Sequence, residues 1–182
     1  LARIAKPGDK AEPLGGVRFR ADPKLGADVG NLQQALIFKY GEVVVKGLAQ
    51  PSKPVYSFFV DSSKDVLHLQ LRTSTPISLD AWLDGAGGKA GALKDQKRSA
   101  LRRENTALVI LCDGMEPRDD ASFHTVQPMQ AFDLQVHVVA PEKAADLDTA
   151  IKAVNKIDVN GAVKGQMDVW NKSCVKWGGC CC

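Results

Sequence analysis

The sequence lacks an apolar run of the roughly 20 residues that a membrane-spanning helix needs. It also lacks a strong charge of one sign, because 24 basic residues stand against 21 acidic ones, for a net charge of +3. The first absence excludes a transmembrane helix, and so mild a positive charge does not by itself indicate a nucleic-acid-binding protein.

Several catalytic and cofactor motifs are also missing from the sequence. There is no G-x-x-x-x-G-K-[ST] loop, and the segment Gly85–Gly88 does not stand between a strand and a helix as a dinucleotide-binding loop requires. There is no G-x-S-x-G nucleophile elbow and no H-E-x-x-H zinc motif. These absences predict no cofactor and no metal site.

Cysteine usage does not indicate a disulfide framework. There are five cysteines, an odd number, and three of them end the chain as Cys180, Cys181 and Cys182. After Gly178 and Gly179, this end resembles the prenylated terminus of Rab-type small GTPases, although the chain lacks every other GTPase motif. Metal binding, a link to another chain and a simple flexible end are the alternatives, and their order stays open.

What is present is an ordinary globular composition. The 182 residues are 45% hydrophobic and 25% charged, which suits one domain with its own core. We expect an irregular arm over 1–30, with a short strand at 17–20, a β-sandwich over 31–140, and a helical segment with a Cys-rich end over 141–182. Because Leu1 stands where an initiator Met is usual, we expect a processed chain or a fragment.

Alternating apolar residues predict most of the strands. Leu67, Leu69 and Leu71 share one face of a half-buried strand, while His68 shares the other face with Gln70. The pattern predicts three antiparallel strands over 55–83, with a stop at Pro76. Further strands are predicted at 42–48, 106–112 and 132–138, whereas 31–40 fits a helix or a strand.

Two segments read as long loops, and the end of the chain reads as helical. The Gly-rich, basic segment 85–104 and the segment 115–128 carry no strand pattern. Helical spacing appears over 141–157, and again in the apolar stripe Val163, Met167, Trp170, Cys174 and Trp177. The predicted fold is mainly β, an antiparallel β-sandwich or jelly roll with one or two C-terminal helices.

The strand pattern also predicts which side chains form the core. These are Val44, Phe58, Val60, Leu67, Leu69, Leu71, Leu79, Val109, Leu111, Leu134, Val136 and Val138. His68 and His137 fall on the opposite, polar faces. We expect both to be solvated, although neighbouring strands would allow the pair to hold a metal or a sugar.

Two sets of residues are candidate contact sites. Six cations of the basic segment are expected to contact anions, an acidic partner or RNA: Lys89, Lys94, Lys97, Arg98, Arg102 and Arg103. The alternative is a solvated loop, since no aromatic residue lies among them to stack on bases. The large side chains Met167, Trp170 and Trp177 must be buried on the sheet or on another protein chain.

Four strand segments and one helix, in this order, carry a wider pattern: Glu42–Val45, Tyr56–Val60, Asp65–Leu71, Pro76–Leu83 and Met167–Trp177. They resemble the N-terminal β-sandwich of fucosidase-like glycoside hydrolases and the helix that leads from it toward an (α/α) barrel. Trp170, Ser173 and Trp177 match that helix, whereas its leading His and doubled Trp are missing. The resemblance implies the sandwich alone, without the barrel that carries the family's catalytic carboxylates.

The sequence thus supports competing classes of function. The first is a non-catalytic module, either a structural or binding subunit that contacts other protein chains or an accessory carbohydrate-binding domain. The second is a viral coat-type jelly roll that contacts RNA through its basic segments. An enzyme is the third, with His124, Asp119 and Asp120 as its only cluster. The sequence leaves the cellular compartment open.

Overall fold

The computed structural model of the chain describes residues 16–22, 32–37, 42–47, 53–61, 64–84, 89–93, 98–117 and 122–176. The described strands are β1 (Gly16–Asp22), β2 (Leu32–Ile37), β3 (Glu42–Gly47), β4 (Val55–Asp61), β5 (Val66–Asp84), β6 (Lys89–Leu93), β7 (Arg98–Arg103), β8 (Thr106–Cys112), β9 (Met115–Pro117), β10 (Ser122–Thr125) and β11 (Met129–Val139). A 3-10 turn at Ala144–Asp146 leads into α1 (Leu147–Ala153), and α2 (Val159–Lys176) follows.

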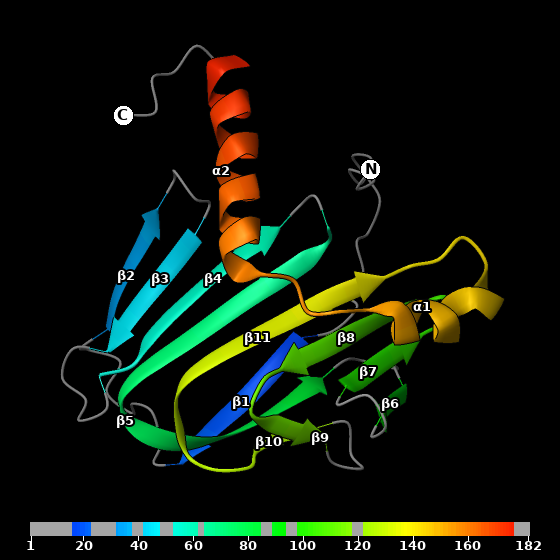
Figure 1. Cartoon of the computed structure of the whole chain (residues 1–182), viewed down its shortest axis with the longest axis horizontal. Helices are drawn as coiled ribbons and strands as arrows, with labels where there is room; N and C mark the ends of the chain where they lie inside the picture. Colours follow the sequence, from blue (N-terminus) through cyan, green and yellow to red (C-terminus); the bar gives the residue numbers. More distant parts are fainter. Residues whose placement is uncertain are drawn as a thin grey trace.

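All of these strands join one antiparallel sheet that is folded into two layers. The front layer has the order β2-β3-β4-β5-β11-β8-β7-β6, and Figure 1 shows it beneath both helices. The second layer consists of β1, β10 and β9 with the C-terminal half of β5. The predicted class, mainly antiparallel β with helices at the C-terminal end, is therefore confirmed.

Strand β5 is shared by both layers. Its first half pairs with β4 and β11, and its second half pairs with β1 and β10. Pro76 does not end it, so the prediction of three separate strands over 55–83 was wrong. The proline is exposed where the register against β11 shifts, and a missing N–H is tolerated at such an irregularity.

The main core lies between the two layers. Its fully buried members come from both, with Phe132 and Ile110 in the front layer and Ala81 and Phe123 in the second. A smaller apolar cluster joins Leu147 and Ile151 of α1 to the outer face of β7 and β8. At β7 and β8 the front layer is thus covered on both faces.

Seven of the predicted core residues are buried in or packed against the main core, or are buried beneath α1: Leu67, Leu69, Leu71, Leu79, Val109, Leu134 and Val136. Val44, Phe58 and Leu111 are half-buried. Val60 and Val138 are 51% and 42% exposed, so their placement in the core was wrong. They line an open apolar groove together with Val17 of β1.

Both predicted loops contain strands. The segment 85–104 holds the hairpin β6–β7, and 115–128 holds β9 and β10. The β7 strand escaped the pattern because Ala100 and Leu101 are buried on opposite faces, which removes the alternation. The ambiguous segment 31–40 contains the strand β2, and the predicted strand at 17–20 is β1.

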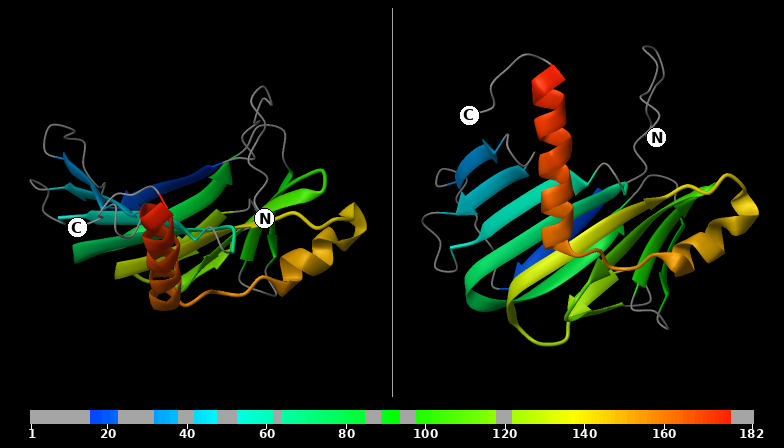
Figure 2. Two further views of the ribbon diagram at one scale, coloured as in Figure 1. Left: turned by 90° about the horizontal axis from the view of Figure 1, so that it is seen from above. Right: turned by 45° about the horizontal axis from the view of Figure 1, so that its top comes forward.

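The helical region is shorter than its sequence pattern. Only Leu147–Ala153 of the predicted helix over 141–157 is α-helical, and the connection 154–158 that follows has no regular structure. We call residues 154–158 the α1–α2 connection. In Figure 1 and in the right view of Figure 2, α2 extends beyond the edge of the sheet. No helix of the described ranges is both long and apolar enough to cross a membrane.

The layered core predicts how individual substitutions act on stability. Phe132→Ala should lower the free energy of unfolding by about 3–5 kcal/mol, because it leaves a cavity in a fully buried site. Val60→Ala is the control and should change it by about 0.5 kcal/mol or less. Urea unfolding followed by circular dichroism measures both, and equal losses would contradict the assigned core.

Candidate functional site

A group of polar side chains lies on the front layer beside the α1–α2 connection. Because Leu69 and Leu71 point into the core, the intervening Gln70 and the next residue, Arg72, point to the outer face. The same alternation on β11 turns Asp133 and Gln135 outward. Since β5 and β11 are neighbours, Gln70 stands directly opposite Asp133.

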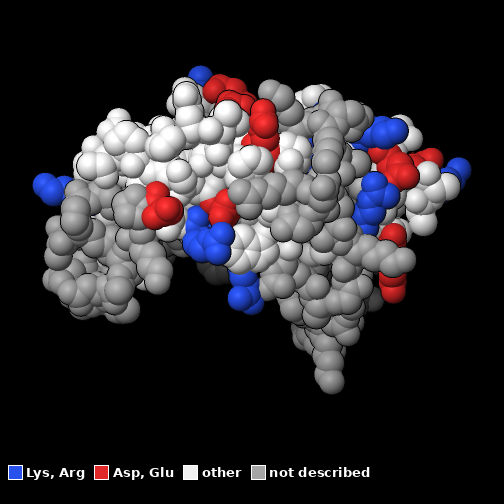
Figure 3. All heavy atoms as spheres, turned by 90° about the horizontal axis from the view of Figure 1, so that it is seen from below, with Lys and Arg blue, Asp and Glu red and all other residues white. Residues whose placement is uncertain are grey.

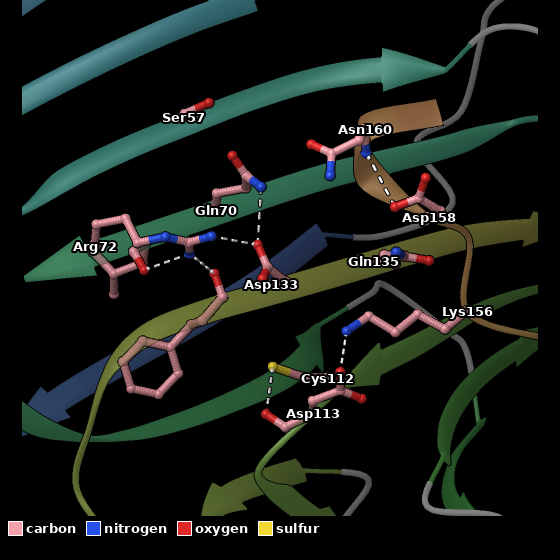
Figure 4. A network of polar contacts seen from close by, with 12 residues as sticks. Ser57, Gln70, Arg72, Cys112, Asp113, Asp133, Gln135, Lys156, Asp158 and Asn160 are labelled. Carbon is pink, nitrogen blue, oxygen red and sulfur yellow. Dashed lines mark hydrogen bonds and ion pairs between the residues drawn. The ribbon is translucent and has the colours of Figure 1, made fainter. Parts of the chain in front are cut away.

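Asp133 is the centre of a network between these two strands (Figure 4). Its Oδ1 accepts hydrogen bonds from Gln70 Nε2 and Arg72 Nη2, both at 2.9 Å. Arg72 Nη1 also donates to the carbonyl oxygens of Phe132 at 2.9 Å and Leu71 at 3.1 Å. Three hydrogen-bond acceptors therefore fix the orientation of the Arg72 guanidinium group.

Gln135 fastens the α1–α2 connection to the sheet. Its Nε2 donates to the carbonyl oxygen of Ile157 at 2.6 Å, and its Oε1 accepts from the Ile157 N–H at 2.8 Å. Gln135 is completely buried, so both polar ends of its amide are satisfied by the backbone that covers them. The Gln135 amide thus donates one hydrogen bond to the backbone of Ile157 and accepts one from it, as a residue on a neighbouring strand would.

The α1–α2 connection supplies the other wall of the site. Lys156 forms an ion pair with Asp113 in the turn that follows β8. Asp158 accepts hydrogen bonds from the N–H groups of Gly161 at 3.0 Å and Asn160 at 3.3 Å, and so caps α2. Between the walls lies a cavity of about 430 Å³, which we call the polar groove. Its lining is Gln70, Arg72, Asp133, Lys156, Ile157, Asp158, Val159 and Asn160.

The two strand histidines are not solvated, and this expectation was wrong. His68 is 1% exposed and His137 is 7% exposed, because α1, α2 and their connection cover the polar face of β5 and β11. His68 stacks on Phe59 with ring centroids 4.6 Å apart. Within the described residues neither of its ring nitrogens has a hydrogen-bond partner. His137 Nε2 lies 3.3 Å from Gln135 Oε1.

Burial keeps both imidazoles neutral. Burial lowers the pKa of His68, against the opposing influence of Asp61 and Asp133. The pKa of His137 is lowered to about 4, mainly by burial and to a smaller extent by the nearby His68 and Arg98. The strands are neighbours, as a metal-binding pair requires, but in the described part of the chain no three His, Cys, Asp or Glu side chains gather as a metal site.

The basic segment is partly engaged within the chain. Arg98 donates to the carbonyl oxygens of Ile151, at 3.0 Å, and Lys152 at the end of α1, and Arg102 forms an ion pair with Asp148. These two cations therefore attach α1 to β7. Lys89 and Arg103 lie on β6 and β7, and Lys94 and Lys97 fall outside the described residues. Anion or RNA contact by these cations stays a prediction.

Charge on the described surface is mixed. On the face shown in Figure 3, acidic and basic side chains of the described residues are interspersed. His124 lines a second cavity of about 460 Å³ with Arg20, Asp22 and Asp80, and Arg20 pairs with Asp80 at 2.7 Å. Its two proposed catalytic companions, Asp119 and Asp120, fall outside the described residues.

The predicted partner contacts belong to α2. Met167 is half-buried there, and Ala162 is buried nearer the start of the helix. The side chain of Trp170 and the whole of Trp177 fall outside the described part. Their contact with another chain stays a prediction.

Sequence reasoning missed the polar groove itself. Gln70, Asp133 and Gln135 looked like ordinary solvent-facing residues of separate strands. The available signal was alternation, which puts Gln70 on the same face of its strand as His68 and Arg72, and Asp133 on the same face as Gln135. These residues form one site only when β5 is paired with β11.

Comparison with known proteins places this fold. No family model and no curated protein matches the sequence. A bacterial glucoamylase complexed with acarbose is similar in structure, with a TM-score of 0.56 and 12% identity over 87% of this chain. A kojibiose phosphorylase from the human microbiome is also similar, with a TM-score of 0.54 and 13% identity over 85% of this chain.

The chain has the fold of one part of each of these proteins. It spans 31% of the glucoamylase chain and 27% of the phosphorylase chain. At 12% and 13% identity, this likeness shows the fold alone. The narrower resemblance to fucosidase-like enzymes stays a prediction.

The two hydrogen bonds between Gln135 and Ile157 give a prediction for stability. Gln135→Ala removes both hydrogen bonds to Ile157 and should lower the free energy of unfolding by about 2–3 kcal/mol. Gln130→Ala is a matched control, because Gln130 also bonds a carbonyl, that of Ser74, but is exposed. Urea titration should show a change of about 0.5 kcal/mol or less for this control. Equal losses of stability in Gln135→Ala and Gln130→Ala would contradict this role of Gln135.

The buried histidines predict an acid-sensitive fold. The pKa of His137 is about 4 in the folded chain and 6.5 without the fold, so between pH 6.5 and 4 the unfolded state takes up a proton more readily than the folded state. Stability should therefore fall as the pH drops from 6.5 toward 4, and the lowered pKa of His68 acts in the same direction. His137→Gln should flatten this slope in thermal unfolding measured across the range, and an unchanged slope would contradict the assignment.

Proposed function

We propose that the chain is a non-catalytic accessory β domain of a carbohydrate-active protein, and that it supports a separate helical catalytic unit. The observation that carries this proposal is its structural likeness, over 87% and 85% of its length, to one part of a glucoamylase and of a kojibiose phosphorylase. The weak resemblance of the sequence to a β-sandwich that precedes an (α/α) barrel favours the same role.

The placement of α2 supports docking on a partner. Near its start, Ala162 is buried and the helix contacts β4. Farther along, α2 leaves the sheet (Figures 1 and 2). Met167, which is half-buried, and Trp170 both belong to this later part of α2. We infer that the large apolar residues at these positions contact another protein unit.

The proposal is tested by purifying the full tagged chain from its source cells and assaying maltose and kojibiose turnover, with and without phosphate. We expect turnover only in fractions in which a helical protein, identified by mass spectrometry, accompanies the chain in equal amounts. Trp170→Ala should weaken that association about tenfold, as expected for an aromatic interface residue. The exposed variant Asn155→Ala should leave it unchanged.

Two results would contradict this role. One is turnover by the chain alone that is lost in His124→Ala, which would restore the enzyme hypothesis. The other is a large species in size-exclusion chromatography with strong absorbance at 260 nm, which would favour the coat-protein alternative.

A further inference from the structure

We propose that the polar groove binds an uncharged saccharide through its ring hydroxyls. This inference rests on the proposed carbohydrate-related function and assigns that function a binding site. The groove lies between the Arg72–Asp133 pair on the sheet and Asn160 at the start of α2, and these groups come from three separate elements. Its volume of about 430 Å³ falls in the range of small-ligand sites, roughly 300–1,000 Å³.

Charge balance within the groove argues for a neutral ligand. Among the described residues, its lining contains two cations, Arg72 and Lys156, and two carboxylates, Asp133 and Asp158. Arg72 is already paired with Asp133 at 2.9 Å, and Lys156 is paired with Asp113 just outside the lining. An anion would have to compete with these carboxylates, whereas a hydroxyl group has no such cost.

The unused hydrogen-bonding capacity of the groove suits hydroxyl groups. The hydrogen bonds that Gln70 and Arg72 donate to Asp133 both go to Oδ1, so Oδ2 has acceptor capacity to spare. Gln70 uses only its Nε2 in these bonds, and its Oε1 remains an acceptor. Arg72 and the side-chain amide of Asn160 add donors. A sugar hydroxyl both donates and accepts, so neighbouring hydroxyls match such a mixed set.

The sheet wall is also fixed before any ligand arrives. Arg72 is held by three acceptors, and Gln135 holds the opposite wall through Ile157. Little ordering is therefore needed on binding, which favours recognition even in an open groove. Because no aromatic residue is among the described residues that line the groove, we expect no stacking from them and weak binding in the millimolar range.

The test is NMR titration of the ¹⁵N-labelled full chain with maltose and, separately, with kojibiose. At least one disaccharide should shift the side-chain amide signals of Gln70 and Asn160 and the backbone signals of 156–160. Asn160→Ala should weaken the affinity about fivefold, the effect of losing one hydrogen bond. Asn155→Ala is the matched control, because Asn155 is an exposed asparagine of the same connection but does not line the groove.

Three outcomes would overturn the inference. They are shifts confined to other regions, no shifts with either sugar, and stronger binding of inorganic phosphate at the same signals. An unchanged unfolding midpoint in Asn160→Ala shows that a lost affinity is not a folding defect. The test is independent of the partner experiment. A chain that binds its helical unit but no sugar refutes only sugar binding in the groove. A chain that binds a sugar but no helical unit refutes only the docking role.

Discussion

The continuity of β5 is the constraint on which the rest of the structure depends. Over 19 residues it hydrogen-bonds to β4 and β11 in the front layer and to β1 and β10 in the second. The bend near Pro76 lets one strand serve both layers. Thr73 supports this bend by donating to the carbonyl oxygen of Thr75 at 2.8 Å. The main core exists only because this strand brings Leu71 and Ala81 to the same interior.

A second consequence follows from covering the front layer on both faces. Antiparallel sheets commonly leave one face in water, and polar residues then alternate with apolar ones at no cost. Here the polar face is covered by α1 and by the α1–α2 connection, so His68, Gln135 and His137 are buried. Gln135 compensates by bonding the connection, whereas the histidines are kept neutral by their surroundings. The polar groove is the part of this face that the connection leaves open.

The functional proposal rests on architecture first and on side chains second. The likeness to parts of a glucoamylase and of a kojibiose phosphorylase shows the fold alone, and a fold does not specify chemistry. The chemistry that we propose for the chain comes from the groove, where Arg72 is paired with Asp133 and Lys156 with Asp113. Arg98 and Arg102, which had looked like free cations, instead attach α1 to the sheet and so help to frame this region.

The sequence by itself determined the class of the fold and most of its strands, because period-two alternation at Leu67–Leu71 or Leu134–Val136 reflects one buried face. It could not reveal β7, where Ala100 and Leu101 are buried on both sides, nor the passage of β5 through Pro76. Only the tertiary structure decided that His68 and His137 are buried and that Gln70, Arg72 and Asp133 form one network. Both facts depend on which strands become neighbours and on what covers them, and those are long-range contacts that local alternation does not encode.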